Sequence, residues 1–222
     1  MTGPAGAPRL VAPGVRALVA TTTDVLTAAG GAEPARALLA PYELTRVDRL
    51  RRPGDRDDHV AAHVLVRRVA AALLADGGSS VAAGDLVLEQ RCPGCGGDTH
   101  GRPAIVGVDD LHVSLSHARG WVAAAASDRS CGIDVEPVTP VVPLRGVLTP
   151  GEAAELEACA PGERNTAFLR LWTRKEAVVK TGAAGLEDLA RLDVRGADPV
   201  AGVRVLDLPT PPAVVAAIAL GA

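Results

Sequence analysis

The hydrophobic pattern of this chain changes its period several times, and each half contains helix-like and strand-like stretches. Residues 58–74 (DHVAAHVLVRRVAAALL) place Val60, Val64 and Leu65 on one face of a helix. A second helical pattern occupies residues 164–182 (RNTAFLRLWTRKEAVVKTG). Because helices and strands occur in both halves, we expect an α+β (α/β) fold. The 222 residues suffice for one large domain or two small ones.

Strand-like stretches surround these helical patterns. Residues 110–117 (DLHVSLSH) alternate in polarity, and residues 120–128 (GWVAAAASD) followed by 131–138 (CGIDVEPV) are typical of a hairpin of neighbouring strands. No flexible linker separates the two halves. The other predicted strands are residues 15–26, 84–90, 191–196, 203–208 and 213–220.

The helices of the second half carry start and stop signals. Thr149, Pro150 and Glu152 open residues 148–160 (LTPGEAAELEACA) as a capping box with proline at the first helical position. Gly182 follows the second helix at a C-cap position. The sequence therefore predicts two capped helices in this half.

The composition excludes several classes of protein. Hydrophobic residues make up 48% of the chain and the formal net charge is −3, which is typical of a globular domain rather than a disordered or nucleic-acid-binding chain. No uninterrupted apolar stretch of about 18 residues is present, so we predict no membrane span. The N-terminus has no basic region followed by a continuous apolar segment, so we predict no signal peptide and a cytoplasmic location.

Two groups of residues have spacings that metal sites use. Cys92 and Cys95 form a C-x-x-C turn with His100 nearby, but no second C-x-x-C completes four zinc ligands, so a reduced, glycine-rich turn is the favoured interpretation. His59 and His63 are four residues apart on the predicted helix, yet the glutamate of H-E-x-x-H is missing. We therefore reject a zinc protease.

The segment GIDVEP carries two acids in one strand. Asp134 and Glu136 are two residues apart, so both carboxylates point to one side of the strand, while Ile133 and Val135 point to the other. One interpretation is the solvated face of a half-buried strand. The other is a pair of ligands for a hard divalent cation, and a third carboxylate from elsewhere would suit Mg²⁺.

The helix that contains LWTRKEAVVK offers that third carboxylate. Trp172, Glu176 and Lys180 follow at four-residue intervals and so share one helix face, and Lys175 is rotated by about 100° from Glu176. Taken alone, Glu176 and Lys180 are an ordinary surface ion pair. Their meaning depends on what lies beside them.

Further polar residues lie at turns. His117 follows a strand and precedes the turn ARG, where an imidazole can meet a phosphate, although a histidine that merely ends a strand is as good an interpretation. Ser116 is compatible with a turn-capping hydroxyl, and Arg102 is constrained between a glycine and a proline. The chain has no Rossmann, P-loop or nucleophile-elbow motif.

The order and spacing of these segments are more specific than any one of them. HGRP, VSLSH, GIDVEP and LWTRKEAVVK follow one another as in the Sfp-type 4′-phosphopantetheinyl transferases, which this chain resembles over residues 45–195. The two signatures of that family are G-[IV]-D-x-E and [WF]-[SCT]-x-K-E-[AS]-x-x-K. Residues 132–136 and 172–180 fill both.

The resemblance implies a fold and an activity. The fold would be a monomer of two similar subdomains in a pseudo-twofold arrangement, residues 1–110 and 111–222, with coenzyme A in the cleft between them. The activity would be that of a holo-[acyl-carrier-protein] synthase type enzyme, which uses Mg²⁺ to move the 4′-phosphopantetheine arm of coenzyme A to a serine of an apo acyl or peptidyl carrier protein. Adenosine 3′,5′-bisphosphate would leave. The carriers would belong to polyketide, nonribosomal peptide or fatty-acid synthesis.

The resemblance also implies roles for single residues. Asp134, Glu136 and Glu176 would be the metal ligands, and Glu176, or Glu136 through a water, would deprotonate the serine. Lys180 would act in catalysis and hold a phosphate. Arg102 stands where the family has lysine, which keeps a cation but changes its geometry. The residues implied to bind coenzyme A are Arg51, Arg52, His59, Arg102, Ser116, His117, Lys175 and Lys180.

A second hypothesis is a catalytically silent module that binds coenzyme A or a nucleotide on the same fold. The complete set of acids and lysines argues against this alternative. No nucleic acid and no membrane is expected as a partner.

Overall fold

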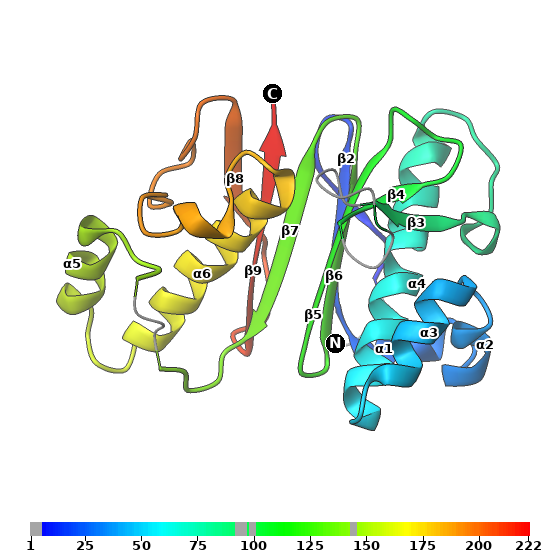
Figure 1. The fold of residues 1–222 in the computed structure, drawn as a ribbon, viewed down its shortest axis with the longest axis horizontal. Coiled ribbons are helices and arrows are strands. Elements are labelled where there is room, and N and C mark those ends of the chain that lie inside the picture. Colours follow the sequence, from blue (N-terminus) through cyan, green and yellow to red (C-terminus); the bar gives the residue numbers. More distant parts are fainter. Residues whose placement is uncertain (1–5, 92–96, 98–100, 143–145) are drawn as a thin grey trace. The chain divides into compact units, whose positions relative to one another are not determined.

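The computed structural model describes residues 6–91, 97, 101–142 and 146–222 (Figure 1). The chain divides into two compact units, residues 1–129 and 130–222. Each unit contains helices and an antiparallel sheet, which confirms the predicted α+β class. The division lies after Arg129, whereas the sequence places a boundary after residue 110, because the strands between these positions pair within the first unit. Two similar subdomains remain a prediction.

The first unit is built on a six-stranded antiparallel sheet in the order β1-β2-β6-β5-β4-β3. β6 lies in its interior and pairs with β2 on one side and β5 on the other. Residues 122–126 of β6 are one valine and four alanines, all fully buried, and these small side chains let a helix pack closely on the strand. The strands are β1 (Arg9–Ala12), β2 (Val15–Thr21), β3 (Leu88–Arg91), β4 (Arg102–Ile105), β5 (His112–Ala118) and β6 (Trp121–Ser127).

Helix α4 (Pro53–Asp76) packs on this sheet and is buried far beyond one face. Every residue from Asp58 to Arg67 is buried, because short helices cover the parts of α4 that the sheet leaves open (Figure 1). Buried polar side chains on α4 must therefore find partners inside the unit. The covering helices are α1 (Thr22–Ala28), α2 (Ala32–Arg36), α3 (Pro41–Arg49) and the short 3₁₀ helix η1 (Ala83–Asp85).

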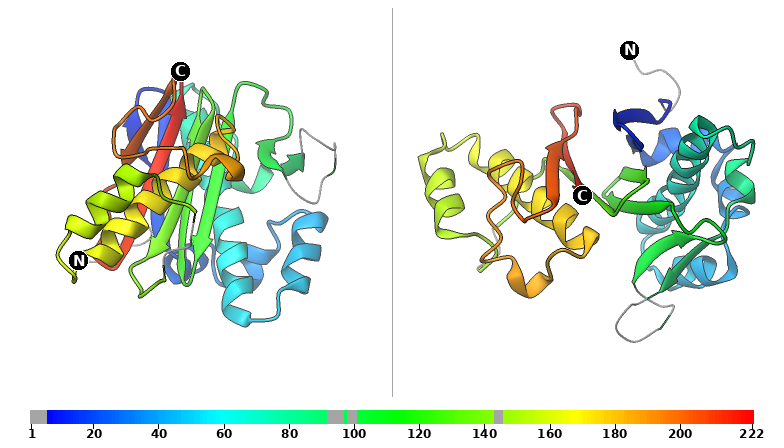
Figure 2. Two further views of the ribbon diagram at one scale, coloured as in Figure 1. Left: turned by 60° about the vertical axis from the view of Figure 1, so that its left-hand side comes forward. Right: turned by 90° about the horizontal axis from the view of Figure 1, so that it is seen from above.

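The second unit is a three-stranded antiparallel sheet, β7-β9-β8, with helix α6 packed on it (Figure 2). α5 packs on α6, and a hydrophobic core fills the space between α6 and the sheet. The elements are β7 (Cys131–Pro137), α5 (Pro150–Ala158), α6 (Arg164–Thr181), the 3₁₀ helix η2 (Leu186–Asp188), β8 (Val203–Asp207) and β9 (Val214–Gly221).

Both helix boundaries predicted for the second unit are confirmed. The Thr149 side chain accepts the Glu152 N–H at 3.2 Å, and Glu152 Oε2 accepts the Thr149 N–H at 2.8 Å, which is the capping box. Gly182 ends α6 with a φ of 79°, a left-handed conformation that glycine adopts without strain.

Three strand predictions are wrong. β6 and β7 do not form a hairpin, because β6 pairs with β2 and β5 while β7 pairs with β9 in the other sheet. The first strand stops at Thr21, whose side chain accepts the Asp24 N–H and starts α1. Residues 191–196 form no strand, since side chains rather than a neighbouring strand bind their backbone.

No helix in the described ranges is both long and apolar enough to cross a membrane.

Candidate functional site

Gly132 explains how β7 and α6 come close enough to share a site. A Cβ atom at Gly132 would lie 2.0 Å from the Ala177 carbonyl oxygen and 2.8 Å from the Lys180 Cβ, so any larger residue would push α6 away. Gly132, Asp134 and Glu136 alternate along the strand and share one face. The two acids therefore lie on the face of β7 that α6 covers, not on a solvated face.

Asp134 and Lys180 form the contact at the centre of this face. The Lys180 Nζ donates to Asp134 Oδ1 at 2.7 Å and to the Ile133 carbonyl at 3.0 Å. Asp134 is 5% exposed. Lys180, whose side chain is 28% exposed, thus supplies positive charge to a carboxylate that water scarcely reaches.

Glu176 belongs to the same electrostatic group. Burial raises the pKa of Glu176 above its usual range, and the negative charge of Asp134 raises that pKa further, while Lys180 opposes the rise. A carboxylate with a raised pKa is a better proton acceptor near neutral pH than an ordinary glutamate. Glu136 is half-buried on the same strand face and lies opposite Val215 of β9.

Lys175 is engaged elsewhere. Its side chain is completely buried, and the Nζ donates to the Leu189 carbonyl at 2.7 Å and to the Leu192 carbonyl. It also pairs with Glu152 Oε2 at 2.8 Å. Lys175 therefore ties α6 to the capped start of α5 and to the segment after η2. Its predicted contact with coenzyme A stays a prediction, and its partners in the structure are those of a buried structural lysine.

The three predicted metal ligands do not close into a preformed cage. Across the described ranges, no three histidine, cysteine, aspartate or glutamate side chains converge closely enough to hold a metal ion. The pair Asp134 and Glu176 nevertheless has the chemistry that a hard cation needs, because one carboxylate disfavours the ionisation of the other. Cys92, Cys95 and His100 lie outside the described residues.

The first unit brings two of its predicted residues together. The rings of His59 and His117 meet edge to face, with centroids 5.8 Å apart. His59 is buried and His117 is exposed at the end of β5. Ser116 alternates to the other face of β5 and is 9% exposed.

The basic residues predicted before α4 and on β4 lie on the surface. Arg51 and Arg52 are exposed just ahead of α4, with Arg52 at its N-cap position. Arg102 is exposed on β4. Their roles in binding coenzyme A stay predictions.

Asp58 is a residue that the sequence analysis missed. Its carboxylate accepts the Gly120 N–H at 3.0 and 3.1 Å and the Thr22 hydroxyl at 2.5 Å. The contact holds the turn between β5 and β6 against α4, next to His117. An acid that directly precedes a buried helical run was the only signal in the sequence.

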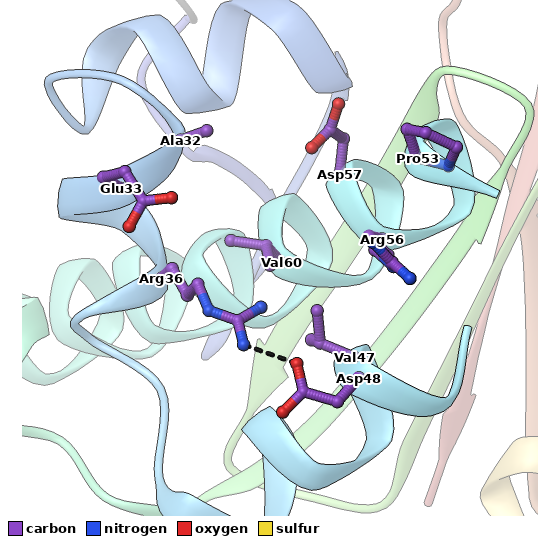
Figure 3. Close-up of a pocket in the computed structure, with 9 residues that line it drawn as sticks. All are labelled: Ala32, Glu33, Arg36, Val47, Asp48, Pro53, Arg56, Asp57 and Val60. Atoms are coloured by element: carbon purple, nitrogen blue, oxygen red, sulfur yellow. Dashed lines mark hydrogen bonds and ion pairs between the residues drawn. The ribbon is translucent and has the colours of Figure 1, made fainter. Parts of the chain in front are cut away.

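Two described pockets are lined by other residues. One, of about 340 Å³, lies among α2, α3 and α4, where Arg36 and Asp48 form an ion pair at 2.6 Å (Figure 3). The other, of about 480 Å³, lies beside the start of α6 and the loop between β8 and β9 and includes Arg170. Neither includes a predicted site residue.

Comparisons with known proteins agree with these segments. Residues 130–212 match the model of the 4′-phosphopantetheinyl transferase superfamily. A 4′-phosphopantetheinyl transferase of Bacillus subtilis is 30% identical over 89 residues, which cover 39% of this chain and 40% of that protein. The 4′-phosphopantetheinyl transferase AcpT of Salmonella typhimurium is 36% identical over 98 residues, 42% of this chain and 51% of AcpT. The 4′-phosphopantetheinyl transferase Sfp of B. subtilis strain 168 is 30% identical over 89 residues.

The matched segments thus span about half or less of these relatives.

Proposed function

We propose that this chain, whose residues 130–212 match the 4′-phosphopantetheinyl transferase superfamily, transfers the 4′-phosphopantetheine arm of coenzyme A to a serine of an apo carrier protein. The observation that carries the proposal is the group of Asp134, Glu176 and Lys180 at the contact of β7 and α6. This group lies inside the segment that matches the family, residues 130–212.

The reaction exchanges one phosphorus–oxygen bond for another. The serine hydroxyl of the carrier attacks the phosphorus that bears the pantetheine arm and loses its proton to Glu176, or to Glu136 through a water. The bond to the adenosine-bearing phosphate breaks, and adenosine 3′,5′-bisphosphate leaves. The raised pKa of Glu176 supports its role as the base.

Mg²⁺ is the proposed metal. Asp134 and Glu176 would hold it, with Glu136 as a third ligand or as a ligand through water, and Mg²⁺ commonly keeps several waters. When bound, the ion would neutralise charge that develops on the pyrophosphate. Lys180 pairs with Asp134, and as the cation of this group it would also hold a phosphate of coenzyme A.

The first unit would hold coenzyme A. An exposed imidazole at His117 suits a phosphate, and Arg51, Arg52, Arg102 and Ser116 complete the set proposed to contact the ligand. His59 is buried against His117 and would act through that ring. A monomeric enzyme and a cytoplasmic location belong to the same proposal. The test below identifies which type of carrier protein the chain modifies.

The test is to weigh the carrier. The chain is incubated with coenzyme A, Mg²⁺ and apo carrier proteins of fatty-acid, polyketide and nonribosomal peptide type, and intact mass is measured. We expect one carrier to gain the mass of a single phosphopantetheine arm, and its Ser→Ala variant to gain nothing. Binding of coenzyme A without a mass gain on any carrier would instead favour the silent binding module.

A further inference from the structure

A buried ionic cluster joins three elements of the first unit. The Arg67 guanidinium donates two hydrogen bonds to the Glu43 carboxylate, from Nη1 to Oε1 at 2.9 Å and from Nη2 to Oε2 at 2.6 Å. Its Nε donates a third hydrogen bond to the Leu86 carbonyl at 3.0 Å. His63 Nδ1 contacts the same Glu43 carboxylate. Glu43, His63 and Arg67 are each at most 2% exposed. α3, α4 and the segment after η1 are therefore locked together here.

The charge of Glu43 fixes the proton on His63. Burial opposes the ionisation of Glu43, but hydrogen bonds from His63 and Arg67 outweigh it and lower the pKa of Glu43 to about 2. An ionised carboxylate only accepts hydrogen bonds, so His63 must donate from Nδ1. The orientation of the His63 ring is thus set by a buried ion pair.

Two further histidines extend from this cluster to the surface. The His59 ring stacks on His63 with centroids 4.1 Å apart and planes 25° apart. His117 then meets His59 edge to face at 5.8 Å and 77°. His63 is 2% exposed, His59 is 7% exposed and His117 is exposed. We call these three residues the histidine column.

His59 carries no positive charge in this column. Burial lowers its pKa, the charges of His63, His117 and Arg46 lower it further, Glu43 opposes them, and the result is about 3. A neutral ring packs against the His117 imidazole without placing a positive charge beside it. His59 Nε2 is buried and makes no hydrogen bond within the described part of the chain, so the ring is placed by stacking rather than by a polar partner.

We propose that His63 and His59 are positioning residues, which hold the His117 imidazole in the orientation that contacts a phosphate of coenzyme A. The inference rests on the proposed function, since that function supplies the phosphate. It adds two residues that act through a third. Glu43 and Arg67 fix the orientation of the His63 ring, and His63 fixes the plane of the His59 ring by stacking. His59 then restricts the orientation of the His117 ring. Removal of the His59 ring takes away the aromatic surface that the His117 ring meets edge to face.

The decisive experiment is a double-mutant cycle on coenzyme A binding. The dissociation constant of coenzyme A is measured by calorimetry for the wild type, His59→Leu, His117→Ala and the double variant. His59→Leu should weaken binding about 3- to 10-fold, because a misdirected His117 ring loses its hydrogen bond to the phosphate. In the His117→Ala background the same change should have almost no effect, because its only route to the ligand is gone.

Two controls separate positioning from stability. His59→Phe keeps an aromatic ring in the stack and should restore most of the affinity that His59→Leu loses. His112→Ala changes an exposed histidine at the other end of β5 and should leave affinity unchanged. The chain has five histidines, so NMR can follow the ring signal of His117 directly, and His59→Leu should move it while His112→Ala should not.

The outcomes are distinguishable. A wild type that binds no coenzyme A and modifies no carrier ends the proposed function, and the positioning role ends with it. A wild type that binds and transfers, but in which His59→Leu weakens binding equally in both backgrounds or leaves the His117 signal unmoved, overturns the positioning role alone.

Discussion

At the scale of single residues, the site depends on how three charged groups balance. Lys180 neutralises Asp134, and Asp134 in turn makes Glu176 harder to ionise. Each of the three therefore affects the protonation or the charge of another. Substitutions that keep shape but change charge are the ones that separate these effects.

Replacing Glu176 by glutamine should lower transfer activity and raise the stability of the fold at neutral pH. Loss of a positioned base should lower transfer at least about 100-fold. Because the folded pKa of Glu176 is raised, folding favours its protonated form, and the wild type loses stability as pH rises through that pKa. Glu176→Gln should therefore be the more stable protein at neutral pH, and the gain should vanish in acid. Denaturant titrations at several pH values measure this, and an equally stable or weaker variant at neutral pH would contradict it.

Asp134→Asn should stop transfer and leave the fold intact. The amide keeps the size of the side chain and an oxygen for Lys180, and Lys180 is 28% exposed, so water can solvate the ammonium. The metal, however, loses a charged ligand. Chelation of the wild type with EDTA should have the same effect and should be reversed by added Mg²⁺. The intact mass of the carrier reports both results, and transfer that survives chelation would remove the metal from the proposal.

At the scale of elements, the site exists because α6 packs unusually close to β7. Gly132→Ala would place a methyl carbon 2.0 Å from the Ala177 carbonyl, so α6 must shift. We expect a loss of about 1–3 kcal/mol in the free energy of unfolding, as for other overpacked cores, together with reduced transfer. Gly162→Ala is the matched control in the same unit, since nothing lies within 4 Å of a Cβ there. Equal stabilities of the two variants would show that the helix tolerates the shift.

Glu43 should stabilise the packing of α3 on α4 through its buried ion pair with Arg67. Glu43→Gln leaves Arg67 buried without its charged partner, which should lower the free energy of unfolding by about 3–5 kcal/mol. The wild type has a depressed folded pKa of about 2, so its stability from this pair is present above the ordinary glutamate pKa and is lost as pH falls from about 4.5 to 2. The stabilities of the wild type and Glu43→Gln, measured by thermal unfolding, should therefore converge as pH falls through that window. A constant difference would assign the loss to packing alone.

The elements differ in how far the sequence predicts them. The helices of residues 53–76, 150–158 and 164–181 are recognisable because their periodicity and caps are local signals. The partners of β6 and β7 are not recognisable from the sequence, because two apolar strands that follow each other along the chain can join the same sheet or different sheets. The signature residues identify Asp134, Glu176 and Lys180, but the need for Gly132 appears only when the helix lies on the strand. Lys175 shows the limit most clearly, since the signature does not reveal that this lysine is completely buried and paired with Glu152.

At the scale of the whole molecule, the proposed function divides between the two units. The first unit contains the histidine column and the second contains Asp134, Glu176 and Lys180. If the first unit binds the phosphates and the second carries out the transfer, substitutions in each should change different constants. His117→Ala should raise KM for coenzyme A about 3- to 10-fold and change kcat little, as expected for lost binding to a phosphate.

The second unit should respond in the opposite way. Lys180→Met should lower kcat more than it raises KM, because a cation that contacts the pyrophosphate helps most when charge develops during bond cleavage. Initial rates with carrier in excess and coenzyme A varied give both constants for the two variants. Arg170→Ala is the control in the same helix, because Arg170 is exposed and has no role in the proposed site, and it should leave kcat with coenzyme A unchanged. If His117→Ala lowered kcat while Lys180→Met raised only KM, the division would be reversed, and the base and metal would have to be sought in the first unit.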